Sequence, residues 1–544
     1  MAAPTSTLRP APRPNTEADP RRWWALAALS LALFMALLDN TVVNVALPHI
    51  QTSLHTSISG LQWVVSAYSL VFGALLITGG KFGDLFGRKR IFLGGLAVFT
   101  AASALCGLAP NLNALHAFRA VQGIGGAAIF PLTLAITNET FEGRERALAI
   151  SIWGAISGAA IALGPVVGGV LVDHVSWRSV FFVNLPIGAI VATIALYAVR
   201  ESRDGTSSGR IDWAGTLLSS AALFAIIYAL TETGTPGWGW GTRNNLLTLG
   251  AGVALLAAFI ATELAILRRG GEPMVDLRFF RNLGFSGANA VAFLVSLGMF
   301  GSFFYASIYL QDVLGYSAMG AGLRILPIAA GIMVGAPLSG QLAAKIGPRW
   351  PLGFGMALAA AGVLLWAGLM GPHAGYNDFV VAFPIFGFGM GLVFPAIGTA
   401  VLNTVPRDQS GVATGINDMS REVGGTFGIA VMAAIFNPAY HSGLVTETAK
   451  AGLPASVATA LNSGAQAAGS SAAQLPAELA VRVHGALQAA FSGAMVDVLR
   501  VGAVLLLLGS ATAFALMGRA RAVEPAESAA EGETAETLEY AAAD

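Results

Sequence analysis

The sequence is poor in charged residues and almost free of cysteine. Charged side chains make up 11% of its 544 residues, and Cys106 is its single cysteine. One cysteine excludes an internal disulfide and a cysteine-based metal cluster. Neither a G-x-x-x-x-G-K-S/T motif nor an H-E-x-x-H motif occurs, so ATP-driven transport and zinc hydrolysis have no support. We therefore expect no metal, no cofactor and no enzymatic activity.

Apolar residues, in contrast, are abundant and occur in long runs. They make up 55% of the chain, and the mean hydropathy is +0.68. A helix needs about 20 apolar residues in succession to cross a bilayer. We predict an all-α polytopic membrane protein with 14 transmembrane helices, at residues 23–47, 62–82, 91–109, 112–137, 147–172, 178–199, 211–231, 245–267, 284–310, 320–344, 350–371, 377–402, 411–436 and 494–517.

The distribution of lysine and arginine predicts the orientation. Of the 30 such residues, 22 lie in the N-terminal tail or in loops on its side, four lie in the opposite loops, and four lie within or at the edge of a span. Cytoplasmic loops are enriched in these cations. Only four of the 30 are lysines, a composition typical of GC-rich bacterial genomes. We therefore predict a bacterial inner-membrane protein with both termini in the cytoplasm.

A polar loop that occurs twice predicts a duplicated architecture. Residues 80–90 read GKFGDLFGRKR, and a weaker copy at residues 340–349 reads GQLAAKIGPR. Each copy follows the second span of a six-helix set, so the seventh and eighth spans form an extra central pair. Parallel repeats of this kind are typical of secondary transporters with a central substrate site. The residues assigned to the gating loops are Gly80, Gly83, Gly87, Asp84, Arg88, Gly340 and Gly347.

The predicted boundaries follow from this duplication. We expect a cytoplasmic tail at 1–22, a first six-helix half at 23–200, the extra pair with its linkers at 201–282, and a second half at 283–518. The second half includes an external loop at about 437–493, with a short amphipathic helix near 473–490. The tail at 519–544 is rich in alanine and glutamate, and we predict that it is disordered.

Two charged residues fall inside apolar spans of the first half. Asp39 lies in the first span, where a carboxylate near the helix centre costs about 2.5–3.5 kcal/mol. Burial disfavours the charged form of a carboxyl group, which suits a proton carrier, although a permanently paired structural aspartate is the alternative. Arg119 lies in the fourth span and stays charged. It serves either as a structural tie across the bundle or in the control of a neighbouring carboxylate.

The fifth span combines small residues with a proline. Residues 158–169 read GAAIALGPVVGG, and the residues of interest are Gly158, Gly164, Pro165, Gly168 and Gly169. Pro165 removes a backbone donor and kinks a helix, and the glycines allow close helix packing. Packing is certain to be part of their role, and the kink is a candidate gate.

The thirteenth span carries three ionisable residues on one face. Asp418 and Arg421 are three positions apart, and Asp418 and Glu422 are four apart. Residues at these spacings are neighbours on a helix surface. Two acids against one base leave one negative charge or one proton to spare, which favours a part in proton or cation handling. Neutralisation of the acids by Arg421 is the alternative.

These motifs together resemble those of a known family. Residues 80–90 resemble the loop signature of the major facilitator superfamily, and RAVQGIGG at 119–126 and the 158–169 stretch resemble its fourth-helix and antiporter motifs. LDNTVVNVALP at 38–48, WRSVFFVNLP at 177–186 and the 14 spans are similar to the fourteen-helix drug:proton antiporter group, the EmrB/QacA type. The resemblance covers residues 23–518.

The resemblance implies roles for particular residues. Asp84 is expected to brace its loop against the gate of the second half, Arg88 to pair with nearby acids, and Asp39 and Arg119 to take part in proton coupling. Two positions depart from the family pattern: Ala344 stands where the first loop copy has Asp84, and Glu422 stands where many relatives carry a neutral glutamine.

The resulting functional hypothesis is a proton-coupled antiporter that exports a hydrophobic, drug- or antibiotic-like molecule by alternating access. Its expected partners are that substrate, protons and the lipid bilayer, with no nucleic acid, and the chain is expected to be monomeric. One alternative is an exporter of an endogenous metabolite, a lipid precursor or a siderophore. A second alternative is a membrane scaffold or sensor that does not transport.

Overall fold

The structure is a computed structural model that describes residues 20–517 apart from short gaps. The gaps are residues 142, 204–211, 235–236, 272, 372–373, 406–409, 455–456, 458–460 and 462–475. The first 19 residues of the predicted N-terminal tail and the whole of the predicted disordered tail at 519–544 lie outside the described residues.

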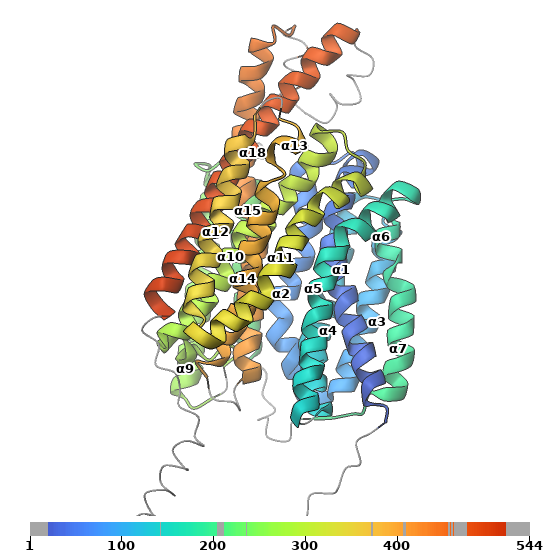
Figure 1. Ribbon diagram of the computed structural model, residues 1–544, viewed down its shortest axis with the longest axis vertical. Helices are drawn as coiled ribbons and strands as arrows, with labels where there is room; N and C mark the ends of the chain where they lie inside the picture. The colour runs from blue at the N-terminus through green and yellow to red at the C-terminus, as the bar shows by residue number, and fades with distance from the viewer. Residues whose placement is uncertain are drawn as a thin grey trace, which may run out of the picture.

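The first half of the molecule is a bundle of apolar helices, blue to teal in Figure 1. Its helices are α1 (Arg22–Leu54), α2 (Ile58–Phe86), α3 (Arg88–Gly107), α4 (Leu112–Thr140), α5 (Gly143–His174), α6 (Ser179–Phe182) and α7 (Asn184–Ala198). The predicted sixth span is therefore broken between α6 and α7. Pro186 explains the break, because its ring clashes with the carbonyl four residues earlier, at the end of α6. The break makes Asn184 the first residue of α7.

The second half stands beside the first and is drawn in yellow-green to red (Figure 1). Its elements are η2 (Leu277–Arg281), α10 (Leu283–Ile308), the π-helical turn η3 (Tyr309–Val313), α11 (Ala318–Ile346), α12 (Arg349–Leu369), α13 (Tyr376–Phe379), α14 (Ala382–Leu402), α15 (Ser410–Lys450) and α18 (Ala477–Leu516). The two halves meet where α1 contacts α10, α2 contacts α15, and α5 contacts α11.

The two copies of the polar loop make the same kind of turn. Gly87 ends α2 with a φ of 109°, and Gly347 ends α11 with a φ of 84°. Residues other than glycine rarely adopt a positive φ of this size. The structure therefore repeats, between the second and third helices of each half, the turn that the sequence repeats.

An extra helix pair covers the junction of α2 and α15. It consists of α8 (Trp213–Thr231), the short turn η1 (Glu232–Gly234) and α9 (Arg243–Arg268). The Oγ1 atoms of Thr78 and Thr216 lie 3.1 Å apart, and the indole N–H of Trp63 donates to Glu232 at 3.1 Å. On the other side, the indole N–H of Trp240 donates to the carbonyl of Ala434 in α15 at 3.3 Å. The pair is thus fastened to both halves.

The helices suit a membrane. Among the described residues, 13 helices are long and apolar enough to cross a bilayer, and a shorter apolar stretch, Leu163–His174, lies in α5. The predicted all-α, multi-pass architecture is confirmed at this level. The arrangement as 14 spans stays a prediction.

The two ends of the bundle differ. We call the end where α1 begins and α18 ends the terminal end, and the opposite one the distal end (Figure 1). At the distal end α15 and α18 continue beyond the other helices, and Arg482 in α18 donates to the carbonyl of Ala451 after α15 at 2.8 Å. The helix expected near 473–490 is therefore not a short separate one, because α18 runs unbroken from Ala477 to Leu516. Hydropathy marks the apolar part of a helix and not its full length.

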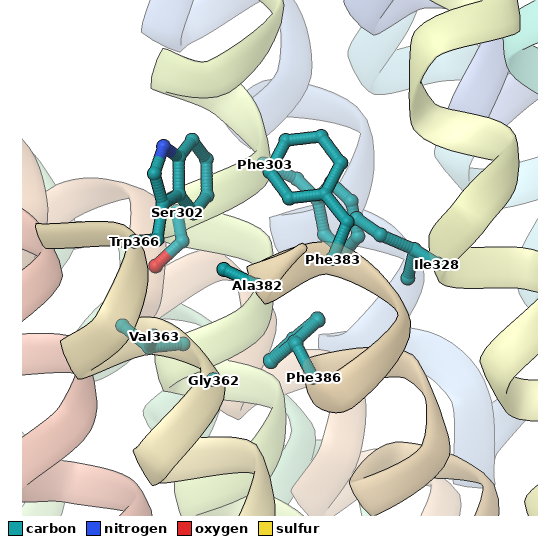
Figure 2. A pocket seen from close by; sticks show the side chains of 9 residues that line it. All are labelled: Ser302, Phe303, Ile328, Gly362, Val363, Trp366, Ala382, Phe383 and Phe386. Carbon is teal, nitrogen blue, oxygen red and sulfur yellow. The ribbon is translucent and has the colours of Figure 1, made fainter. Parts of the chain in front are cut away.

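A small apolar pocket lies inside the second half (Figure 2). Its lining comes from α10, α11, α12 and α14, and consists of Ser302, Phe303, Ile328, Gly362, Val363, Trp366, Ala382, Phe383 and Phe386. The open space has room for about one water molecule, so it does not accommodate a drug-sized ligand in this state. The functional site is better sought among the buried polar groups.

The close contact between α11 and α14 generates a stability prediction. A Cβ atom on Gly387 would collide with the carbonyl oxygen of Ile328, whereas one on Gly398 in the same helix would meet no atom within 4 Å. Overpacking costs about 1–3 kcal/mol. Gly387→Ala should therefore lower the thermal unfolding midpoint of the purified protein in detergent, and Gly398→Ala should not. Equal midpoints for the two variants would contradict this account of the packing.

Candidate functional site

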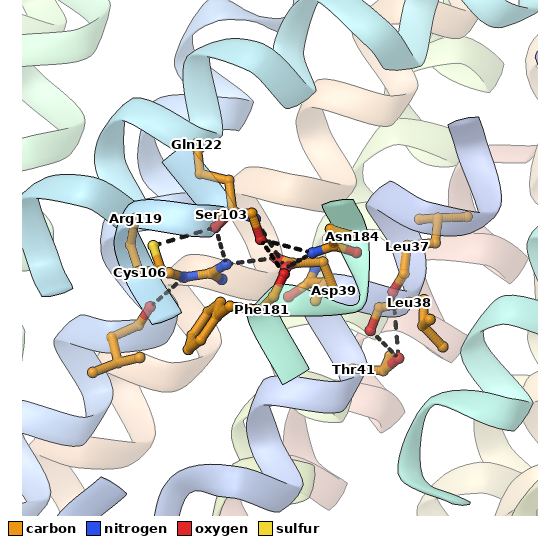
Figure 3. Close-up of polar contacts among 12 residues, drawn as sticks. Leu37, Leu38, Asp39, Thr41, Ser103, Cys106, Arg119, Gln122, Phe181 and Asn184 are labelled. Atoms are coloured by element: carbon orange, nitrogen blue, oxygen red, sulfur yellow. Dashed lines mark hydrogen bonds and ion pairs between the residues drawn. The ribbon is translucent and has the colours of Figure 1, made fainter. Parts of the chain in front are cut away.

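The polar centre of the first half is an ion pair between α1 and α4. An Nη1 N–H of Arg119 donates to Oδ2 of Asp39 at 2.5 Å, and neither side chain has exposed surface. Oδ1 of Asp39 accepts two further hydrogen bonds, from Gln122 at 2.9 Å and from Asn184 at 2.8 Å (Figure 3). Three donors around one carboxylate, one of them a cation, suit its ionised form.

The surroundings of Arg119 hold its guanidinium in one orientation. Its Nε donates to the carbonyl of Val64 in α2 at 3.0 Å, and its Nη1 also donates to Oε1 of Gln122 at 2.8 Å. The ring of Tyr68 stacks on it, with its centroid 4.4 Å from Cζ. A planar guanidinium can make this set of directed contacts and a lysine ammonium cannot.

A further layer of hydrogen bonds ties this centre to α3 and α6. Asn184 donates to Oγ of Ser103 at 3.0 Å, and that hydroxyl donates to the carbonyl of Phe181 at 2.8 Å. The thiol of Cys106 lies 3.7 Å from Oε1 of Gln122. The single cysteine is therefore a buried neighbour of the ion pair (Figure 3).

The acidic residues of α15 are arranged differently. Arg421 pairs with Asp418, with 3.2 Å between Nη2 and Oδ1, and their side chains are 29% and 15% exposed. Glu422 is 7% exposed, and a Cβ atom on Gly73 of α2 would lie 3.4 Å from its Cβ. Glu422 thus lies at the junction of the two halves, whereas the ion pair of Arg421 is with Asp418.

Arg88 of the first polar loop pairs with one acid of the same loop and with one acid of α4. Arg88 donates from Nε to Asp84 at 2.9 Å and pairs through Nη1 with Glu139 at the end of α4 at 2.5 Å. Arg88 therefore pairs with nearby acids, as the motif implied. These contacts lie within the first half, and the expected brace from Asp84 to the second half stays a prediction.

The glycines of α5 allow close approach on two sides. A Cβ atom on Gly164 would collide with Thr41 of α1, and one on Gly169 would collide with the backbone at Met319 of α11. The carbonyl of Pro165 lies directly against Gly322. The motif therefore joins α5 to its own half and to the other half at once, and the surroundings of Gly158 lie outside the described part of the structure.

Hydrogen bonds between the halves gather in the distal part of the bundle. Five of them link described residues: Gln62 to Tyr305 at 2.7 Å, Ser307 to the Asn44 carbonyl at 2.7 Å, Gln311 to the Val45 carbonyl at 3.1 Å, and the amides of Ala318 and Met319 to Asp173 at 3.0 and 2.9 Å. Asp173 thereby caps the first turn of α11 from the opposite half.

A family model for the Major Facilitator Superfamily matches residues 29–429. The chain belongs to the Major Facilitator Superfamily. As a member it is a multi-pass membrane transporter, and the proteins of this family are not enzymes.

Curated relatives of this facilitator superfamily transporter are named for resistance and export. It is 34% identical to the tetracenomycin C resistance and export protein of Streptomyces glaucescens over 435 residues, 80% of this chain and 79% of the relative. It is 37% identical to the multidrug resistance protein Stp of Mycobacterium tuberculosis over 411 residues, 75% of each chain. It is 37% identical to the puromycin resistance protein pur8 of Streptomyces alboniger, over 76% of this chain and 82% of the relative.

Solved structures of the superfamily share the fold of this transporter. A bacterial homolog of the human lysosomal transporter Spinster, in an inward-facing and occupied conformation, superposes with a TM-score of 0.64 at 18% identity. The match covers 92% of this chain and 98% of that one. A POT family peptide transporter gives a TM-score of 0.63 at 13% identity and the same 92% coverage of this chain.

Several polar residues of the transporter were not singled out from its sequence. Gln122 and Asn184 complete the shell of Asp39, yet neutral amides in apolar helices give little signal. Glu263 in α9 has no exposed surface and accepts from the amide of Val275 at 2.9 Å, beside Asp212 at the start of α8. An acid inside the predicted span at 245–267 was a signal that could have identified it.

The buried ion pair predicts unequal effects of single and double substitutions. Arg119→Leu leaves the Asp39 carboxylate buried without its cation, and breaking a buried pair in this way costs about 3–5 kcal/mol. We expect a large loss of stability in chemical unfolding of the detergent-solubilised protein. The double variant Asp39→Asn with Arg119→Leu carries no buried charge there and should recover part of the loss. A double variant no more stable than Arg119→Leu alone would argue against a charged pair.

Proposed function

We propose that the protein is a proton-coupled antiporter of the bacterial inner membrane that exports hydrophobic, antibiotic-like molecules. The two halves alternate between access to the cytoplasm and access to the outside. The chain acts as a monomer, as an EmrB/QacA-type transporter with 14 spans. The observation that carries the proposal is the buried Asp39–Arg119 pair, in a chain whose relatives are named for resistance to antibiotics and drugs.

Asp39 is the proposed proton site of this cycle. A charged pair with no exposed surface is costly, and ionisable groups in membrane spans mark ion pathways and proton relays. A proton bound by Asp39 removes the negative charge that Arg119 faces. The hydrogen bonds around the two side chains therefore change with protonation. Each charge that crosses 100 mV supplies about 2.3 kcal/mol, which can drive export. Asp418 and Glu422 are proposed as further proton or cation sites on the opposite half.

The terminal end is the proposed cytoplasmic side. The positively charged loops are expected there, and both described chain ends lie there (Figure 1). The five hydrogen bonds between the halves then lie towards the outside. On this orientation the structure represents the state that is closed to the outside, from which a substrate is taken up from the cytoplasmic side.

The proposed role of Asp39 is tested by proton movement. Asp39→Asn keeps the size of the side chain and cannot exchange a proton, so it should abolish substrate-induced proton release from inverted membrane vesicles. Each antibiotic of a chemically diverse panel would be added in turn, and binding would be measured in parallel. Asn44→Asp, five residues further along the same helix, serves as a control for charge in α1. Unchanged proton release by Asp39→Asn would remove Asp39 from the mechanism.

The first polar loop is the proposed cytoplasmic gate, formed by Gly80, Gly83, Gly87, Asp84 and Arg88, with Gly340 and Gly347 in the second copy. Asp84→Ala frees Arg88 from one of its two acids. We expect slower transport with substrate affinity largely retained, measured as efflux rate and as equilibrium binding to the same protein. Glu139→Ala, which removes the other acid, is the matched comparison. Loss of binding by Asp84→Ala would show that the loop does more than gate.

A further inference from the structure

We propose that the first turns of α2, residues 58–66, transmit the protonation state of Asp39 to the contact between the two halves, through the hydrogen bond from Gln62 to Tyr305. This inference rests on the proposed function, because it takes Asp39 as the proton site. It adds two neutral residues, neither of which touches Asp39, as positioning residues in the coupling.

The first step is the attachment of these turns to α4. Two consecutive turns of α2 present backbone carbonyls to α4: the Gly60 carbonyl lies 2.9 Å from Nε2 of His116, and the Val64 carbonyl accepts from Nε of Arg119 at 3.0 Å. A Cβ atom on Gly60 would lie 2.8 Å from the Leu112 side chain, so the start of α2 is tightly packed against the start of α4. A shift of Arg119 therefore moves the start of α2 as well.

The second step is the attachment of the same turns to the other half. Gln62 lies between Gly60 and Val64, whose carbonyls are bonded to α4. Its side-chain amide N–H donates to the hydroxyl of Tyr305 in α10 at 2.7 Å. Neither side chain has exposed surface. The Tyr305 ring is stacked on Phe436 of α15, with centroids 4.2 Å apart, so its hydroxyl has little freedom to follow a displaced partner.

The Gln62–Tyr305 hydrogen bond differs from the other hydrogen bonds between the halves in its connection to Arg119. Ser307 and Gln311 bind carbonyls of α1, and Asp173 on α5 caps α11, so none of these three contacts α2 or Arg119. Gln62 is the residue whose own helical turn is bonded to Arg119. A buried amide that loses its partner is penalised heavily, which makes this bond sensitive to small displacements.

The charge on Asp39 determines where Arg119, and with it the start of α2, is held. With Asp39 ionised, Arg119 is held between Asp39 and the Val64 carbonyl, and Gln62 faces Tyr305. When Asp39 binds a proton, Arg119 loses the attraction of the carboxylate and relaxes towards its remaining acceptors on α4 and α2. The start of α2 shifts with it, and the Gln62–Tyr305 bond weakens. The distal closure, which is the set of five hydrogen bonds between the halves at the distal end, then loosens.

Other titratable groups face these elements and belong in the interpretation of any pH dependence. Arg119 and His116 face α2 from α4, Cys106 faces Asp39 from α3, and Tyr68 is on α2 itself. Glu422 of α15 and Glu232 of η1 face the same helix from outside the half.

The test measures how often the distal end is open. Spin labels at Val175→Cys and Val381→Cys report the distance between the halves at that end, since both positions are exposed, at 72% and 52%, and the native Cys106 is buried. The measurement uses the full-length protein in lipid nanodiscs without substrate. The variants are Asp39→Asn, which mimics the protonated state, Tyr305→Phe, which keeps the stacked ring, and their combination.

We expect each single variant to raise the ratio of open to closed molecules, Tyr305→Phe by about 5- to 150-fold. In the combination the effect of Asp39→Asn should largely disappear, so the ratio falls well short of the product of the single effects. Asp173→Asn weakens a link on α5, because it replaces one of the two acceptor oxygens by an amide group, and combined with Asp39→Asn it should give the full product. The pH dependence of the open fraction should likewise flatten in Tyr305→Phe and persist in Asp173→Asn.

The results distinguish the proposed path through α2 from the proposed role of Asp39 as the proton site. If Asp39→Asn and Tyr305→Phe multiply as independently as the Asp173→Asn control, the path through α2 is wrong, while Asp39 can still be the proton site. If Asp39→Asn leaves the distance distribution unchanged, the proposed role of Asp39 fails as well. Gln62→Leu removes the same hydrogen bond from the other side and must reproduce the Tyr305→Phe result, which guards against an effect of the tyrosine ring alone.

Discussion

The burial of one charged pair is the constraint on which the first half depends. Moving two ions out of water costs several kcal/mol for each, and their attraction offsets this only when the remaining donors and acceptors are also satisfied. The shell around Asp39 and Arg119 meets most of that demand with groups from α2, α4 and α7, and leaves Nη2 of Arg119 and Oδ1 of Asn184 without a hydrogen-bond partner among the described residues. The relative positions of four helices are therefore tied to a single carboxylate, and a change in its charge acts on all of them.

The sequence was informative wherever a residue conflicted with its surroundings. Asp39 and Arg119 are conspicuous because charge in an apolar span is costly, and the two polar loops because they interrupt long apolar runs. The turn glycines Gly87 and Gly347 were visible for the same reason, and both adopt a positive φ. Hydropathy was less useful beyond the bilayer, where α15 continues to Lys450 and α18 begins at Ala477.

The contacts of neutral polar residues could not be predicted from the sequence, even where the residues lie within a quoted motif. Gln122 and Asn184 are neutral amides whose importance arises only where α1, α4 and α7 converge, and Gln62 and Tyr305 are 243 positions apart. Pairings of this kind are decided by tertiary packing, which local composition does not encode. The partner of Arg421, in contrast, agrees with helix spacing: Asp418 lies three positions away, whereas Glu422 is the adjacent residue and does not face Arg421.

The chemistry of the distal closure fits a transporter that a few charges can drive. Its five hydrogen bonds join neutral groups, apart from the Asp173 carboxylate, and each has a net worth of about 0.5–1.5 kcal/mol because water replaces the lost partner when the contact opens. One charge crossing 100 mV supplies about 2.3 kcal/mol. The two magnitudes are comparable, so under the proposed proton coupling a small number of protons suffices to shift the equilibrium. The buried Asp39–Arg119 pair lies within one half, so under the proposed proton coupling it responds to a proton without itself holding the halves together.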